Sequence, residues 1–246
     1  PGAAEGMAEA ILGMSFTATP TITPSPTLTP TPDLRGVEAI YNNVQALINA
    51  GNWANALEAL DQLRHDDPTY RTAEVDGMYY FALRYAGSDK ISKEGDLEGG
   101  IYYLTLAERF GPLDSAANGL REAARLYITA ASFWEINWPQ AVNYFGQLAS
   151  FAPNIWDNAS NMNAGQRYYY ALMRYGDELF NQKNPDACGA YAQYSAAQAY
   201  GQLDEVAARN ANQAYQICYP PTATPEPTLE VIPTAEVPTD APPAVE

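Results

Sequence analysis

Apolar and polar positions alternate with a helical period through the middle of the chain. Within residues 51–68 the apolar side chains are spaced at i, i+3, i+4, i+7 and i+10, which places them on one face of an α-helix. These residues are Trp53, Ala56, Leu57, Leu60 and Leu63. Units of the same length recur at 95–112, 136–153 and 185–202. Each unit starts near Gly, Asn or Asp, and the first three end on Pro, as is typical of helix boundaries.

A second helical pattern precedes each of these units. The preceding patterns cover residues 35–50, 72–87, 115–132 and 162–181, and a last one covers 203–218. The alternation predicts an all-α fold, a helical-repeat solenoid of about four antiparallel helix pairs plus a capping helix, over residues 34–219. We expect the extra length near residues 87–95 to be an insertion between two helices.

The second helix of each pair has a regular order of residue sizes. A small residue is followed by a large one four positions later, by another residue three positions after that, and then by a closing proline. The matches are Ala56–Leu60–Leu63–Pro68, Gly100–Leu104–Ala107–Pro112 and Ala141–Phe145–Leu148–Pro153, and a weaker copy without the proline is Ala190–Tyr194–Ala197–Gln202. This pattern resembles the tetratricopeptide repeat family.

The chain departs from that family in the length of its repeat. The closing positions are 44, 41 and 49 residues apart, where the family repeats about every 34. Elongated first helices and the insertion near 87–95 would account for the difference. The resemblance implies a solenoid scaffold and a groove for peptides, and it implies no particular activity.

Two segments rich in threonine and proline flank the repeats, at residues 17–33 and 220–246. Proline removes a backbone donor and restricts φ, so both segments favour extended polyproline II and cannot build a core. Their composition is typical of O-glycosylated stalks, and unmodified flexible linkers are the alternative. The candidate O-glycosylation sites are Thr17, Thr19, Thr21, Thr23, Thr27, Thr29, Thr31, Thr222, Thr224 and Thr228. Asn158 begins the sequon Asn-Ala-Ser in an expected loop and is a candidate for N-glycosylation.

Residues 1–16 form an apolar N-terminal arm that is too short to fold alone. We expect five of its side chains to dock on a subunit surface, and these are Met7, Ile11, Leu12, Met14 and Phe16. The sixteen residues after it span about 50 Å as polyproline II, enough to bring the arm to a neighbouring subunit. The alternatives are the remainder of a membrane-anchor region and a stub between domains.

The chain has two cysteines, Cys188 and Cys218. They have no spacing typical of zinc or haem sites. A hairpin that turns near residue 203 would place them opposite each other, because each lies fifteen residues from the turn. We therefore expect a disulfide, which implies an oxidising compartment; two buried free thiols are the alternative.

Charge and composition exclude several classes of function. The net charge is −16 with only three lysines, so the clustered cations that bind nucleic acid are missing. No apolar run is long enough for a membrane span. His65 is the only histidine, and no nucleotide-binding loop is present. We therefore expect no enzyme, no cofactor and no metal site, and we interpret the acidic pairs Asp66–Asp67 and Asp96–Glu98 as solvated turns rather than calcium ligands.

Tyrosines gather in three clusters on the predicted helices. Adjacent helical residues point about 100° apart, so each cluster must serve both the core and the surface. Packing is one interpretation, and a groove or subunit interface is the other. The interface candidates are Tyr79, Tyr80, Tyr102, Tyr103, Tyr168, Tyr169 and Tyr170.

Together these features indicate a secreted or cell-surface structural protein. The combination of repeats and Thr/Pro-rich linkers resembles extracellular, glycan-coated tetratricopeptide fibrils of microbial communities. Our hypothesis is a filament subunit that assembles head to tail with copies of itself and bears covalent glycans. The alternative is a monomeric cell-surface module that binds peptide or protein in its groove, with the flanking segments as passive linkers.

Overall fold

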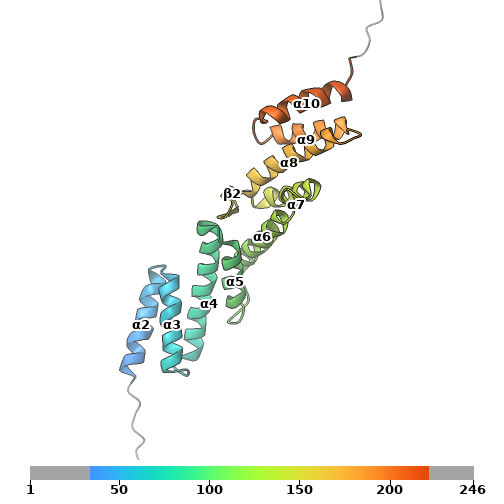
Figure 1. The fold of residues 1–246 in the computed structure, drawn as a ribbon. Coiled ribbons are helices and arrows are strands. Elements are labelled where there is room, and N and C mark those ends of the chain that lie inside the picture. The colour runs from blue at the N-terminus through green and yellow to red at the C-terminus, as the bar shows by residue number, and fades with distance from the viewer. Residues whose placement is uncertain (1–33, 222–246) are drawn as a thin grey trace, which may run out of the picture.

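The computed structural model describes residues 34–221. Over this range the chain forms nine α-helices in series, as an elongated array (Figure 1). In chain order they are α2 (Arg35–Asn49), α3 (Trp53–Asp66), α4 (Thr72–Asp89), α5 (Leu97–Ala107), α6 (Ser115–Ala131), α7 (Trp138–Phe151), α8 (Ala164–Asn181), α9 (Ala187–Gln198) and α10 (Glu205–Cys218). The predicted all-α helical-repeat fold is confirmed.

Each helix packs chiefly on the helices before and after it in the sequence. The pairs α2–α3, α4–α5, α6–α7 and α8–α9 correspond to the four predicted pairs, and α10 packs on α9 and α8 at the end of the array. Each predicted unit includes the N-cap at its start and a turn at its end, so the second helices are shorter than the units. The difference is largest for α5 and α9. The flanking segments 1–33 and 222–246, including the arm and every candidate threonine, lie outside the described residues.

The second helices of the four pairs share one register of capping and packing. Their N-caps are Asn52, Asp96, Asn137 and Asp186, and each side chain accepts a hydrogen bond from the backbone N–H three residues on. Such caps satisfy donors that the first turn leaves without a partner. The residues at N-cap +4, +8 and +11 are all buried in every pair, so the size pattern in the sequence corresponds to the inner face of these helices.

The small position of the second pair brings two helices into close contact. A Cβ built on Gly100 would lie 2.7 Å from the carbonyl oxygen of Gly87 on α4. A Cβ on Gly87 would in turn lie 3.0 Å from the carbonyl oxygen of Gly100. Only glycine at both positions leaves room for α4 and α5 to approach this closely.

Three apolar clusters follow one another along the array rather than forming one central core. The first joins α2 to α5 around Leu60, the second joins α5 to α8 around Phe145, and the third joins α8 to α10 around Tyr194. Each helix pair is therefore stabilised by contacts within the pair and with its immediate neighbours, as in other solenoids.

The extra length near residues 87–95 is used by an extension of the first helix of the second pair. Helix α4 runs on to Asp89, a π-helical turn η1 follows at Lys90–Glu94, and Gly95 ends it with a φ of 66°. A positive φ of this size favours glycine. The sequence predicted the insertion, but not that it would be helical.

The structure also has a short β-hairpin that the sequence did not predict. Strands β1 (Trp156–Asp157) and β2 (Met162–Asn163) pair in antiparallel fashion between α7 and α8. The hairpin lies against the π-helical turn, because Asn158 N–H donates to the Gly95 carbonyl at 3.1 Å and the Trp156 indole N–H donates to the Ser92 carbonyl at 3.4 Å. Two irregular segments far apart in the sequence thus support each other.

Among the helices of residues 34–221, none has both the length and the apolar character that a membrane crossing requires.

Candidate interaction surfaces

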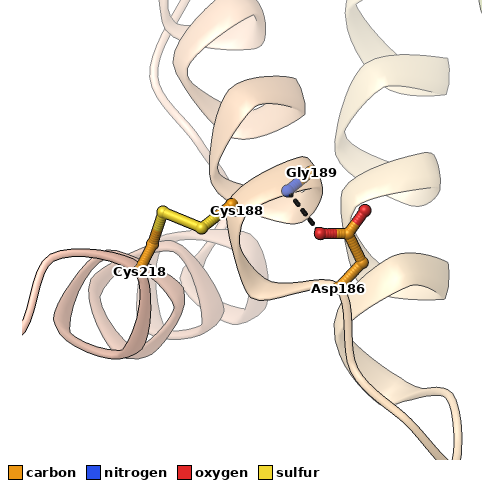
Figure 2. Close-up of a disulfide and its surroundings, with 4 residues drawn as sticks. All are labelled: Asp186, Cys188, Gly189 and Cys218. Carbon is orange, nitrogen blue, oxygen red and sulfur yellow. Dashed lines mark hydrogen bonds between the residues drawn. A yellow bond between two sulfur atoms is a disulfide. The ribbon is translucent and has the colours of Figure 1, made fainter.

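The predicted disulfide between Cys188 and Cys218 is present (Figure 2). Cys188 lies in the first turn of α9 and Cys218 is the last residue of α10, with their Cα atoms 5.1 Å apart. Beside it, the Asp186 carboxylate accepts a hydrogen bond from Gly189 N–H at 2.8 Å and caps α9. The disulfide therefore joins the open ends of the last helical hairpin.

The seven candidate interface tyrosines differ in exposure. Tyr79 is buried and its hydroxyl donates to the Asp61 carboxylate at 2.7 Å, so packing accounts for it. Tyr80 and Tyr169 are partly buried, and their hydroxyls donate to the carbonyls of Pro112 and Gln202.

Of the remaining four tyrosines, only one has a largely exposed side chain. Tyr103, Tyr168 and Tyr170 are partly buried against the apolar clusters. Tyr102 alone is largely exposed, at 61%. Their role in a subunit interface stays a prediction, and for most of them the structure shows an internal contact as well.

The structure has a set of exposed aromatic side chains that the sequence patterns did not single out. Phe110, Phe151 and Tyr200 each lie fourteen residues after the N-cap of their pair's second helix, and all three are exposed. We call them the aromatic row. They occupy equivalent positions at the C-terminal ends of the second helices in three successive pairs. The constant offset from Asp96, Asn137 and Asp186 was a signal that the sequence offered.

Two open grooves lie at the N-terminal end of the array. A groove of about 450 Å³ between α2 and α4 is lined by Ile48, Met78 and Phe81, with the polar groups of Gln45, Asn49 and Glu74 at its sides. A second, of about 340 Å³, lies among α3, α4 and α5, and its lining includes Tyr79, Tyr102 and Tyr103 from the predicted clusters. Both offer apolar surface bordered by hydrogen-bonding groups.

Asn158 is exposed in the turn of the β-hairpin, three residues before the backbone at Asn161 turns to a positive φ. Its backbone N–H is used in the contact with Gly95, whereas its side chain is at the surface. Its glycosylation stays a prediction.

Two equivalent arginine–aspartate pairs join the first helices of successive repeats. Arg84 of α4 donates to both carboxylate oxygens of Asp114, the N-cap of α6, at 2.8 and 3.1 Å. At the equivalent position, Arg174 of α8 donates to one carboxylate oxygen of Asp204, the N-cap of α10, and also pairs with Asp177. A carboxylate that caps a helix and also binds a guanidinium is stabilised in its charged form.

The Arg84 pair predicts an acid-sensitive contact. Hydrogen bonds from Arg84 and from Ala117 N–H hold the pKa of Asp114 far below its usual value. A carboxylate whose pKa is depressed by folding adds stability above its unfolded pKa of about 4, and that stability is lost as the pH falls through the folded pKa. We expect Asp114→Asn to lower Tm by a few degrees at pH 7 and by less at pH 3.

Thermal unfolding followed by circular dichroism at both pH values measures this. The matched control is Glu58→Gln, which neutralises an exposed acid on α3. An Asp114→Asn deficit that stays constant between pH 7 and pH 3 would contradict the assignment.

Within residues 34–221 no group of three or more His, Cys, Asp or Glu side chains could hold a metal ion. His65 is exposed in the last turn of α3. Asp67 accepts hydrogen bonds from Thr69, and Asp96 pairs with Lys90 at 2.8 Å. These acids have local structural partners.

Within residues 34–221, the candidate surfaces for function are thus the disulfide-closed end, the aromatic row and the open grooves. The resemblance to tetratricopeptide repeats has no support beyond the register and the fold, since no family model, no curated protein and no solved structure matches this chain.

Proposed function

We propose that the protein is a structural subunit of an extracellular, glycosylated filament that assembles head to tail. The arm of one subunit, residues 1–16, docks on the next. Membership of the tetratricopeptide repeat family is part of this proposal, and it rests on the shared register of the four second helices.

The observation that carries the proposal is the aromatic row. A surface that recurs at equivalent positions of Phe110, Phe151 and Tyr200 suits a partner that runs along the array. An extended, apolar chain has that form, and residues 1–16 include a phenylalanine, two methionines, an isoleucine and a leucine. Aromatic side chains supply large contact areas at low entropic cost.

The open architecture supports a repeating contact. The two ends of the array, α2 and α10, are different surfaces, so a contact between them is heterologous and generates a filament when it does not close. Helices pack about 8–10 Å apart, and the Thr/Pro-rich spacer spans about 50 Å. The arm of one subunit can therefore pass the α10 end of its neighbour and reach the aromatic row.

The disulfide and the flanking composition support the location and the modification. Disulfides persist in oxidising compartments such as the extracellular space. Thr/Pro-rich segments are typical of O-glycosylated stalks. We therefore place the filament outside the cell and its sugars on the flanking threonines and on Asn158.

Electron microscopy of the purified full chain tests the assembly. We expect fibres from the full chain, none after deletion of residues 1–16, and fewer or shorter ones with Phe151→Ser and Tyr200→Ser together. The matched control is Ile136→Ser, which replaces another exposed apolar residue, in the turn before α7. A monodisperse monomer at high concentration, with or without the arm, would overturn the filament. An intact mass equal to the 26.8 kDa polypeptide would rule out glycosylation.

The groove between α2 and α4 favours a second candidate, a monomeric cell-surface module that binds peptides. Its apolar floor and the amides of Gln45 and Asn49 could hold an extended segment. Monomers that bind peptides from a surface library, and lose binding with Phe81→Ser, would support this candidate over the filament.

A further inference from the structure

The last helical hairpin presents an exposed cluster of three tyrosines next to the disulfide. The rings of Tyr191, Tyr215 and Tyr219 lie with centroids 5.1–5.8 Å apart, so each touches the other two. Tyr215 and Tyr219 are about half exposed, at 49% and 56%. We call this cluster the tyrosine platform.

The hydroxyl groups of the platform are not used in contacts within the array. The hydroxyls of Tyr79, Tyr127 and Tyr194 all donate hydrogen bonds to nearby acceptors. Those of the platform form no hydrogen bond to another residue of the 34–221 range. The platform thus combines stacked aromatic rings with free donors. Grooves that recognise polyproline II have this combination, because the rings pack on proline and the donors reach the backbone carbonyls.

We infer that the tyrosine platform binds the Thr/Pro-rich segment 17–32 of the next subunit. This inference rests on the proposed head-to-tail assembly and assigns the contact that joins two copies. The segment immediately precedes α2, the first helix of the array, whereas the platform is at the opposite end, on α9 and α10. A polyproline contact between them would place the α2 end of one copy beside the α10 end of the other.

The chain's other proline-rich segment fits the platform less well. Residues 220–246 contain five acidic residues, whereas 17–32 contain no charged residue. Helix α10 has no cation after Arg209, so docked carboxylates would lose hydration without gaining a partner. The 220–246 segment also has no glycine and starts with Pro220–Pro221 directly after Tyr219, which disfavours the tight reversal needed to fold back.

The three-residue period of polyproline II divides the segment 17–32 into three faces. Pro24 and Pro30 recur on one face, and Ile22 and Leu28 recur on the adjacent one. The third face holds Thr17, Thr23 and Thr29 together with the other prolines. We assign the first two faces, which also carry Thr19, Thr21, Thr27 and Thr31, to the platform. Within this segment the contact leaves the three threonines of the third face free for sugar.

A binding assay tests the contact apart from fibre formation. The full chain is titrated into a fluorescent synthetic peptide of residues 17–32, and anisotropy is measured. We expect saturable binding that weakens at least about tenfold with Tyr215→Ser and Tyr219→Ser together, as for truncated hot spots. The corresponding Phe double variant keeps the rings and is expected to weaken binding less. Ile136→Ser is the matched control, and circular dichroism verifies that each variant is folded.

Peptide variants test the docking face. Replacing Pro24 and Pro30 with alanine should weaken binding more than replacing Pro20 and Pro26, although both peptides lose two prolines. Equal binding by the Tyr→Ser variant, equal loss with both peptides, or tighter binding of a peptide of residues 222–237 would each overturn the inference. Fibres that still form in the Tyr→Ser variant would also overturn this inference, but they would not contradict the proposed filament. If the peptide binds at the platform but the full chain forms no fibres, the contact is supported and the proposed filament is contradicted.

Discussion

Replacing Phe145 with alanine is expected to lower the free energy of unfolding by about 3–5 kcal/mol. Phe145 is fully buried in the central apolar cluster, with edge-on contacts to Tyr127 and Trp134 at centroid distances of 5.4 and 5.9 Å. The guanidinium of Arg167 lies 5.9 Å from its ring on the side of α8. Truncation would leave a cavity whose rings cannot all collapse inward.

Urea unfolding followed by circular dichroism measures the loss. The control is Phe151→Ala on the same helix, where the side chain is 60% exposed and the expected change is within about 0.5 kcal/mol. Because the clusters follow one another along the array, we expect the Phe145 variant to unfold in more than one step, with α6–α8 first. Equal losses of unfolding free energy for the two variants would mean that burial of the Phe145 side chain is not the main source of its contribution to stability.

Removing the disulfide is expected to have the next largest effect. The bond closes a loop with a sequence separation of 30, for which the chain-entropy description gives a stabilisation of about 3–4 kcal/mol. This contribution is important because the inward face of α10 provides little apolar packing. Its buried apolar residues are Ala207, Ala211 and Ala214, and alanines bury little area compared with leucine or phenylalanine.

The effect should be confined to the end of the array. We expect the Cys188→Ala, Cys218→Ala double variant to lose hydrogen-exchange protection across α10 while α2–α5 keep theirs, since each pair is stabilised by its neighbours. Reduction of the wild-type protein by a thiol should give the same pattern. Unchanged protection of α10 after verified reduction would show that helix packing alone holds the hairpin.

Such a variant also bears on the tyrosine platform. Cys218 lies directly before Tyr219 and within one turn of Tyr215, so fraying of α10 would separate the rings. We therefore expect a folded but reduced protein to bind the 17–32 peptide more weakly than the oxidised protein.

The helices could be predicted from the sequence because their signals are local. The positions +4, +8 and +11 after Asn52, Asp96, Asn137 and Asp186 repeat the size pattern within a single helix, and those N-caps bond within the same turn. The disulfide was predicted for a related reason. Two antiparallel helices joined by a short turn bring residues at equal distances from that turn together, and this geometry depends on counting alone.

The exposed surfaces could not be predicted in the same way. The tyrosine clusters were compatible with both core and interface, and only the neighbouring helices decide that Tyr79 is buried under Phe110 while Tyr102 faces solvent. The same holds for the platform, which is formed by residues from two helices and the turn after them. The contact between the β-hairpin and the π-helical turn joins residues that are 64 apart in the sequence, and no periodic pattern indicates it.

By itself, the sequence determined the all-α repeat and the approximate positions of the helices, and it favoured the pairing of Cys188 with Cys218, because capping, periodicity and the length of a hairpin act over a few residues. The tertiary structure alone decided which apolar side chains remain exposed. Exposure depends on how successive pairs stack, and each side chain's partners there come from other helices. The aromatic row and the tyrosine platform, from which the proposed functions are argued, belong to this second class.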